Sequence, residues 1–338
     1  MKRVKLDFAG LKVEFCDRER ALKQVEELAE KGTWHPLVVF GPEGCGKTAW
    51  LRQSAEVLSS LGFEAVYVDP TRRDFAAHTS VEEVAKRLAE AASEAMGVAQ
   101  LKLATLAVDA VKWLVSKWRR KRVAVLIDDA FQAIGLDKAA TYVKSLLGLT
   151  EHPPEGCERV VAIATTSEGI SRAEIGRHRW AELRGMWNMN KKGFEELYEK
   201  LSSPKPDFEE VWRLTGGNPD ALAKLYRAKW DVDAVVKGLV TSKRLDAFVR
   251  SLSSDERGRL LEAVEDPDSL FTREGMPLLG KLVELNLVVD GITYRDEFLW
   301  VDEPPPQRDL ELGVGRHVAW QTPLHREAVK RAVDLESI

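Results

Sequence analysis

Apolar and polar positions in the first half of the chain follow a pattern typical of buried strands separated by helices. We expect five apolar strands, over residues 37–40, 65–69, 123–128, 160–165 and 181–186. The intervening stretches have the spacing of amphipathic helices, near residues 48–60, 81–96, 103–118 and 138–148. Apolar strands that alternate with helices indicate an α/β fold whose parallel sheet is covered on both faces.

The strand pattern stops near residue 190 and gives way to helices. We expect helices over residues 191–201, 207–214, 219–230 and 232–252, with Gly216-Gly217-Asn218-Pro219 as a helix stop and restart. A third segment begins at Ser253-Ser254-Asp255-Glu256, which matches a capping box. Helices over 254–264 and 273–285, the second capped by Thr272, precede short β-type segments at 287–289 and 315–320. Helix–helix–strand–strand is the order of a winged helix-turn-helix.

One loop in the first block carries a phosphate-binding pattern. Gly41-Pro42-Glu43-Gly44-Cys45-Gly46-Lys47-Thr48 fits G-x-x-x-x-G-K-[ST], after an expected strand and before an expected helix. Glycines let backbone N–H groups surround an anion, and the helix N-terminus adds its positive dipole end. We predict that this loop and Ala49 bind a nucleoside triphosphate. Lys47 would reach the β- and γ-phosphates, and the Thr48 hydroxyl would bind Mg²⁺.

A pair of carboxylates follows the third expected strand. Val123-Ala124-Val125-Leu126-Ile127 leads directly into Asp128 and Asp129. In the interpretation that we favour, Asp128 holds Mg²⁺ through its water shell and Asp129 polarises the attacking water. The alternative is a buried strand that ends in an ordinary turn, where aspartate is common. Aspartate is shorter than glutamate, so we expect slow hydrolysis.

Two further groups could contact the γ-phosphate. The fourth strand ends in Thr165-Thr166-Ser167, where a hydroxyl, with Thr166 as our candidate, could bond the phosphate or the attacking water. Strand-end hydroxyls that cap their own backbone are an equal alternative. Arg177 and Arg179, before the fifth strand, could each supply positive charge in cis or to a neighbouring subunit.

The sequence also limits which nucleotide base is expected, and it contains one possible nucleic-acid-binding cluster. The chain lacks an Asn-Lys-x-Asp element, because Asn190-Lys191-Lys192-Gly193 has no carboxylate to read guanine, so ATP is favoured. Residues 117–122 form a basic cluster around Trp118 that could bind nucleic acid. Its place at an expected helix C-terminus favours a solvated cap, where cations complement the helix dipole.

Composition sets limits on the class of protein. The 338 residues are 44% hydrophobic and 31% charged, which is typical of a globular chain with room for two or three domains. No apolar run approaches a membrane span, no secretory signal is visible, and the three cysteines form no metal-ligand spacing, so we expect a cytoplasmic protein without membrane contact. Only 10 residues are Asn or Gln against 104 charged ones, a bias typical of heat-adapted proteins.

Several motifs together resemble a known family. The chain resembles archaeal ATPases of the signal-transduction (STAND) branch of AAA-like P-loop proteins, relatives of origin-recognition initiators. The resemblance rests on five elements besides the phosphate loop: Phe15-Cys16-Asp17-Arg18-Glu19, Asp128-Asp129, Gly176-Arg177, Gly217-Asn218-Pro219, and residues 282–288 with 321–326. Thr165-Thr166-Ser167 departs from the family's Gly-Ser-rich strand end.

The resemblance implies an organisation and a set of roles. It implies a P-loop ATPase core over residues 1–189, a helical lid over 190–252 and a winged helix over 253–338. It implies that Arg18 and Pro219 contribute to the nucleotide pocket and that Arg177 senses the γ-phosphate. The cofactors would be ATP and Mg²⁺, and the nucleotide state would reposition the lid and the winged helix.

Three functions remain in competition. The first is an ATP-hydrolysing molecular switch that docks on an unknown protein partner or on a second copy of itself. The second is an initiator or loader that binds duplex DNA through the winged helix, and the third is a small-molecule kinase. Residues 241–338 carry 13 Lys and Arg against 19 Asp and Glu, which disfavours DNA, since DNA affinity comes mainly from neutralised phosphates. Paired acids suit water activation better than transfer to a substrate hydroxyl.

Overall fold

The structure is a computed structural model that describes residues 2–93, 98–129, 131, 134–167 and 169–335. Two compact units are present. The first comprises Met1–Leu6, Arg18–Phe40 and Lys47–Gly185, and the second comprises Asp7–Asp17, Gly41–Gly46 and Met186–Ile338. The phosphate loop is thus divided, since residues 41–46 pack within the second unit while Lys47 begins a helix of the first.

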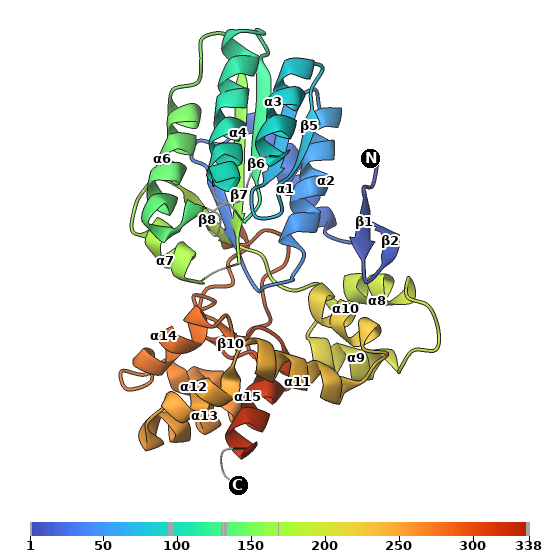
Figure 1. The fold of residues 1–338 in the computed structure, drawn as a ribbon, viewed down its shortest axis with the longest axis vertical. Helices are drawn as coiled ribbons and strands as arrows, with labels where there is room; N and C mark the ends of the chain where they lie inside the picture. The colour runs from blue at the N-terminus through green and yellow to red at the C-terminus, as the bar shows by residue number, and fades with distance from the viewer. Residues whose placement is uncertain (1, 94–97, 130, 132–133, 168, 336–338) are drawn as a thin grey trace. The chain divides into compact units, whose positions relative to one another are not determined.

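A six-stranded sheet forms the centre of the first unit (Figure 1). Its order is β5 (Asp74–His78), β4 (Glu64–Asp69), β6 (Arg122–Ile127), β7 (Arg159–Thr166), β3 (Leu37–Phe40) and β8 (Glu182–Gly185). The strands β4, β6, β7, β3 and β8 are parallel. Only β5, which the sequence pattern did not predict, pairs antiparallel, with β4. The predicted α/β class with a parallel core is confirmed.

Helices cover both faces of this sheet. The helices α3 (Glu82–Ser93), α4 (Val98–Ser116) and α6 (Leu136–Glu151) share one apolar core with alternate strand residues such as Val66, Val68 and Val125. On the other face lie α1 (Glu19–Lys31) and α2 (Lys47–Ser60), which contact β7 and β4 respectively. The short helix α7 (Gly169–Gly176) packs against α6. Because side chains alternate along a strand, Tyr67 of β4 points toward α2.

The second unit is mainly helical. Its helices are α8 (Lys191–Glu199), α9 (Phe208–Thr215), α10 (Pro219–Arg227), α11 (Val232–Ser242), α12 (Leu245–Ser251), α13 (Ser254–Glu265), α14 (Met276–Glu284) and α15 (Pro323–Leu335). Short 3-10 helices cover Pro267–Leu270 and Glu297–Leu299. The strands β9 (Val288–Val289) and β10 (Ala319–Trp320) pair antiparallel. Two N-terminal strands, β1 (Lys5–Phe8) and β2 (Leu11–Glu14), form a separate two-stranded sheet that the sequence pattern did not predict.

Local signals set several boundaries in this unit. The predicted capping box is present, because the Ser253 hydroxyl accepts from the backbone N–H of Glu256 and the Glu256 carboxylate accepts from that of Ser253. The single helix predicted over residues 232–252 is wrong. It breaks into α11 and α12 at Arg244, whose φ of 51° is incompatible with a continuous right-handed helix. The three-domain division stays a prediction.

No helix among the described residues is both long and apolar enough to cross a membrane.

Candidate functional site: a nucleotide-binding site

The carboxyl ends of three neighbouring parallel strands bring acids and a hydroxyl to one edge of the sheet. Val68 of β4 is level with Ile127 of β6, and Ile127 is level with Ala164 of β7. The residues that follow, Asp69, Asp128 and Thr165, therefore lie side by side. Ligands of open parallel sheets bind at this edge.

Asp128 is buried and held by two side chains. It lies directly after β6, one residue beyond the strand, and its backbone N–H donates to the carbonyl oxygen of Val68 at 2.9 Å. The Thr165 hydroxyl donates to Asp128 Oδ1 at 2.6 Å, and the Tyr67 hydroxyl donates to Asp128 Oδ2 at 3.1 Å. One donor on each oxygen fixes the plane of the carboxylate, and each oxygen keeps acceptor capacity for another partner.

Asp129 has the environment of a general base. Its φ is 43°, its backbone N–H donates to Thr165 Oγ1 at 3.3 Å, and its Oδ1 accepts from the Ser167 hydroxyl at 3.4 Å. Burial first, and then the charge of Asp128, raises the pKa of Asp129 to about 6, against the opposing charge of Lys47. A carboxylate whose pKa lies near neutrality is suited to accept a proton from water during hydrolysis.

Lys47 and Thr48 occupy the first turn of α2. The Lys47 side chain is buried, and its charge acts on Asp129 within the first unit. At a helix N-terminus the free N–H groups and the dipole favour an anion. This turn can therefore receive phosphate oxygens close to the two aspartates.

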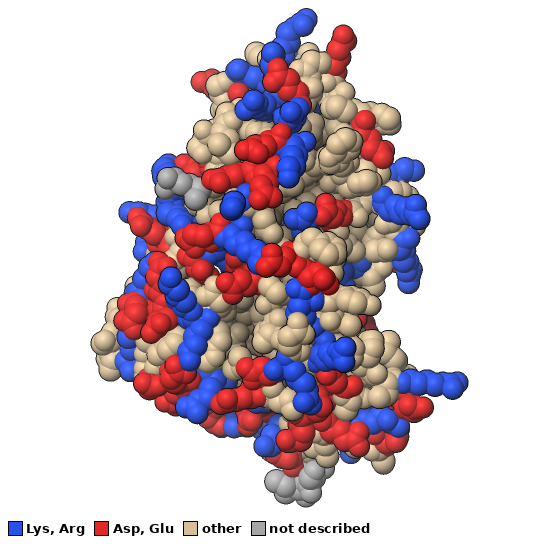
Figure 2. Space-filling view, turned by 180° about the vertical axis from the view of Figure 1, so that it is seen from behind, with Lys and Arg blue, Asp and Glu red and all other residues tan. Residues whose placement is uncertain are grey.

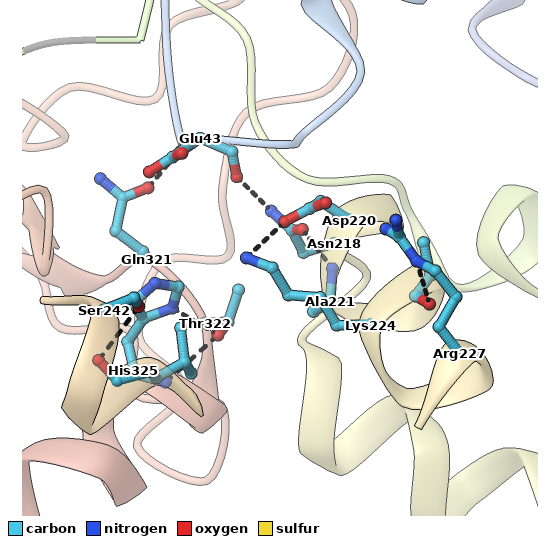
Figure 3. A network of polar contacts seen from close by, with 12 residues as sticks. Glu43, Asn218, Asp220, Ala221, Lys224, Arg227, Ser242, Gln321, Thr322 and His325 are labelled. Carbon is cyan, nitrogen blue, oxygen red and sulfur yellow. Dashed lines mark hydrogen bonds and ion pairs between the residues drawn. The ribbon is translucent and has the colours of Figure 1, made fainter. Parts of the chain in front are cut away.

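Glu43, in the phosphate loop, is hydrogen-bonded to side chains that come from far along the chain (Figure 3). The backbone N–H of Glu43 donates to Gln321 Oε1 at 2.7 Å, and the backbone C=O of Glu43 accepts from Asn218 Nδ2 at 2.9 Å. Asn188 links the two amides, since its Oδ1 accepts from Asn218 Nδ2 at 2.8 Å and its Nδ2 donates to the Gln321 carbonyl oxygen at 3.3 Å. We call Asn188, Asn218 and Gln321 the amide clamp.

Two motif glycines are required by the packing of the loop within the second unit. A Cβ on Gly41 would lie 2.0 Å from the Met186 carbonyl oxygen. A Cβ on Gly44, whose φ is +76°, would lie 2.3 Å from Cβ of Asp220, and the Gly44 carbonyl accepts from the Asp220 N–H at 3.3 Å. The glycine pattern thus serves the second unit's contact with the loop in addition to the phosphate cradle.

The remaining predicted site residues lie in different settings. Arg18 is buried at the start of α1 with a φ of 66°. Thr166 is buried at the end of β7, whereas Thr165, one residue earlier, makes the bonds to both aspartates. Pro219 is the first residue of α10, directly after the clamp residue Asn218. Arg177 is exposed after α7 and pairs with Glu174 at 2.7 Å.

The residues fit Mg²⁺ by their donor chemistry. Thr48 and Asp128 offer the oxygen ligands that this ion prefers, and a buried acidic pair beside them would gain from a cation. The described residues include no cluster of three or more His, Cys, Asp or Glu side chains that could hold a metal by themselves.

The basic cluster at residues 117–122 is largely neutralised. Lys117 pairs with Glu83 at 2.8 Å, Arg120 with Glu64 at 3.2 Å, and Lys121 with Glu158 at 2.9 Å. These ion pairs support the interpretation of the cluster as a solvated helix end and strand start, not as a nucleic-acid site.

Several residues of the site were not predicted from the sequence. Gln321, Asn188, Tyr67 and Arg52 belong to no motif that we used. Asn218 was noted as a helix boundary and within the Gly217-Asn218-Pro219 element, without a contact to the phosphate loop. The one local signal is polarity, because Tyr67 lies within an otherwise apolar stretch of β4 and Gln321 directly follows the strand β10. Their partners lie between 15 and 278 residues away, so only the fold brings them together.

Solved structures with similar folds have low sequence identity to the chain. The Aeropyrum pernix ORC2 protein in its ADP form is 13% identical over 93% of this chain and 92% of that one, with a TM-score of 0.47. The Aeropyrum pernix ORC1 protein in complex with DNA is 14% identical over 96% and 93%, with a TM-score of 0.37. AMPPCP-bound DnaA from Aquifex aeolicus is 16% identical over 80% and 78%, with a TM-score of 0.37. No curated protein matches the chain.

A family model supplies the stronger comparison. The model describes an ATPase domain predominantly from Archaea and matches residues 15–225, which is more than half of the chain. The matched segment runs from the box around Arg18 through the phosphate loop and both aspartates to α10. It confirms the resemblance to archaeal ATPases that the motifs indicate. With its phosphate loop, its paired acids and this match, the chain belongs to the family of predominantly archaeal ATPase domains and is an ATP-binding ATPase.

Proposed function

We propose that the protein is a slow, Mg²⁺-dependent ATPase that works as a molecular switch. The nucleotide state of the phosphate loop would reposition the helical lid (residues 190–252) and the C-terminal module (residues 253–338), which we assign as a winged helix. Lys47 and Thr48 would hold the phosphates and Mg²⁺, Asp128 would help to hold the ion, and Asp129 would accept the proton of the attacking water.

The observation that carries the switch is the amide clamp on Glu43. Asn218 belongs to the lid and Gln321 to the C-terminal module, and they bond the two sides of one peptide segment in the loop. The side chain of Glu43 adds a weaker contact, since Lys243 Nζ lies 3.5 Å from its carboxylate. A change of loop conformation on nucleotide binding would therefore break or strain contacts in both modules at once.

Charge supports a protein partner over DNA. Several basic side chains of the C-terminal module are already engaged. Arg295 donates to four backbone carbonyls, and Lys281 and Arg308 pair with Glu256 and Asp266 respectively. Basic and acidic side chains are intermixed on the face shown in Figure 2. We propose that the module docks on another protein or on a second copy of this chain, with duplex DNA as the alternative target.

The clamp can be tested by nucleotide affinity. Gln321→Leu removes the acceptor of the Glu43 N–H at nearly constant volume, and Gln307→Leu, at an exposed position of the same module, is the matched control. Because the contact is shared between loop and module, Gln321→Leu should change the ratio of ATP to ADP dissociation constants roughly three- to tenfold. Equal ratios in the wild type and both variants, measured by calorimetry, would refute coupling through the clamp.

A further inference from the structure

We propose that Tyr67 and Arg52 are positioning residues that hold the Asp128 carboxylate in the orientation needed for the metal–nucleotide complex. The inference rests on the proposed function of Asp128 and extends it to two residues outside the recognised motifs. We call the chain of contacts from Asp74 through Arg52 and Tyr67 to Asp128 the relay.

The relay is a continuous series of hydrogen bonds within the first unit. Arg52 Nε donates to the Tyr67 hydroxyl oxygen at 3.3 Å, and the Tyr67 hydroxyl donates to Asp128 Oδ2 at 3.1 Å. At the far end, the Arg52 guanidinium is paired with the carboxylate of Asp74 on β5. Tyr67 is 1% exposed, so its hydroxyl has no access to bulk water in place of these partners.

The direction of the relay is fixed by chemistry. A guanidinium can only donate, so the Tyr67 oxygen is the acceptor toward Arg52. The single hydroxyl proton of Tyr67 is then left for Asp128, whose Oδ2 accepts it. Thr165 donates to the other oxygen of the same carboxylate at 2.6 Å. The carboxylate is therefore held from both sides by donors whose roles cannot be reversed.

The position of Arg52 indicates that the relay does more than provide hydrogen-bond partners for the buried Tyr67 hydroxyl. Arg52 lies four residues after Thr48 on α2, so the two side chains share one face of the phosphate-loop helix. The relay thus ties the helix that carries Lys47 and Thr48 to the strand end that carries Asp128. The relay also places the Arg52 guanidinium two hydrogen bonds away from Asp128, which lies beside Asp69 and Asp129. Against the opposing effect of burial, the negative charge of Asp128 is among the causes that raise the pKa of Arg52.

The structure provides a matched control for the loss of a buried hydroxyl. Tyr142 is also buried in the first unit, and its hydroxyl donates to the Ala104 carbonyl oxygen at 2.7 Å. Tyr67→Phe and Tyr142→Phe each remove one buried phenol hydroxyl, but only Tyr67→Phe removes contacts of the relay, to Arg52 and to Asp128. A purely structural role for Tyr67 predicts the same behaviour from both variants.

The test measures metal binding directly. Mn²⁺ binding to the protein–ADP complex is followed by electron paramagnetic resonance, and ADP binding in EDTA provides the metal-free reference. We expect Tyr67→Phe to raise the Mn²⁺ dissociation constant roughly three- to tenfold, since it removes one donor from a charged acceptor. Metal-free ADP affinity should be unchanged, and Tyr142→Phe should change neither quantity.

A second variant tests the connectivity of the relay. Arg52→Gln should weaken Mn²⁺ binding less than Tyr67→Phe does, and the double variant should be no weaker than Tyr67→Phe, because the two residues act in series. If Tyr67→Phe fails to fold, Arg52→Gln carries the test. Wild-type Mn²⁺ affinity in Tyr67→Phe, equal losses in Tyr67→Phe and Tyr142→Phe, or additive losses in the double variant would overturn the relay.

The readout separates the relay from the proposed function. Mn²⁺–ADP binding needs no hydrolysis, so a wild-type protein that binds the complex without turning over ATP would contradict the switch and leave the relay standing. A wild-type protein that binds no Mn²⁺–ADP would overturn both.

Discussion

At the scale of single residues, Asp129 has the features that a base for water needs. It follows Asp128 in a left-handed conformation, and its carboxyl is buried beside a second carboxyl, so protonation is easier than in water. The hydroxyls of Thr165 and Ser167 hold its backbone N–H and its Oδ1. These contacts aim the side chain without removing its charge.

We expect Asp129→Asn to lower kcat for ATP hydrolysis by about 100-fold or more, because the amide cannot accept the proton from water. Asparagine tolerates the positive φ of this position, so the fold should persist. ATP affinity, measured separately by calorimetry, should stay within about twofold of the wild type. Wild-type turnover in Asp129→Asn would remove Asp129 from the mechanism.

Gly44 provides a second prediction at this scale. Gly44→Ala places a Cβ at a positive φ and 2.3 Å from Cβ of Asp220, so we expect it to lower the free energy of unfolding by at least about 1 kcal/mol and to weaken ATP binding. Gly258, within α13, has open space around its Cβ position. Gly258→Ala should instead stabilise by about 0.5–1 kcal/mol. Denaturant titration compares the two, and a neutral Gly44→Ala would show that the loop's contact with Asp220 is not maintained in solution.

At the scale of elements, the sequence pattern predicted those helices and strands whose boundaries are set by local signals. The boundaries of β3 and the start of α13 were predicted correctly, because an unbroken apolar run and a capping box are local. The edge strand β5 was missed, since Asp74–His78 has only three apolar residues, none of them fully buried, and forms a strand by pairing with β4. The break at Arg244 depends on one left-handed residue that no periodicity reveals.

In the candidate site, too, residues in local motifs were predicted, and residues whose contacts depend on the fold were not. Lys47, Thr48, Asp128 and Asp129 were predicted because their motif is contiguous and carries its own chemistry. The amide clamp and the relay were not, because an amide or a phenol acquires its partner only from the fold. Thr165, which bonds both aspartates, could not be distinguished from Thr166 by sequence, since the choice depends on which strand face each residue occupies.

The helix α15 carries a pH-dependent prediction. His325 is buried in its first turn, with Nδ1 2.8 Å from the Thr322 hydroxyl oxygen. Burial first, and then the charges of Lys243 and Lys224, lowers the pKa of His325 to about 3. Below pH 6.5, His325 is protonated in the unfolded chain but stays neutral in the folded chain down to about pH 3. The contribution of His325 to stability is therefore present above this pH and is lost as pH falls toward 3.

We expect the free energy of unfolding to fall with decreasing pH between 6.5 and 3 with a contribution from His325 of up to about 1.4 kcal/mol per pH unit. His325→Asn should flatten this slope relative to the wild type, whereas His152→Asn, at an exposed position, should leave it unchanged. Urea titrations across this pH range measure the slopes. Parallel slopes in the wild type and His325→Asn would contradict a buried neutral imidazole.

At the scale of the whole molecule, the phosphate loop belongs to two parts of the chain. Residues 41–46 pack with the second unit, and residues 47–48 begin a helix of the first. If the loop packs differently in two conformations of the protein, a nucleotide bound to the loop would have a different affinity for each conformation. Such a difference in affinity is the thermodynamic requirement for a ligand-driven switch. In the proposed switch, the amide clamp would connect the loop to the lid and to the C-terminal module.

Hydrogen exchange in the full-length wild-type protein tests this switch most directly. Backbone exchange is compared between the Mg²⁺–ADP complex and the complex with a non-hydrolysable ATP analogue. The switch predicts different protection in peptides that cover the loop at 41–48, the lid at 216–227 and the C-terminal segment at 315–325. Identical protection of the lid and the C-terminal segment in the two complexes, with both nucleotides bound, would contradict it.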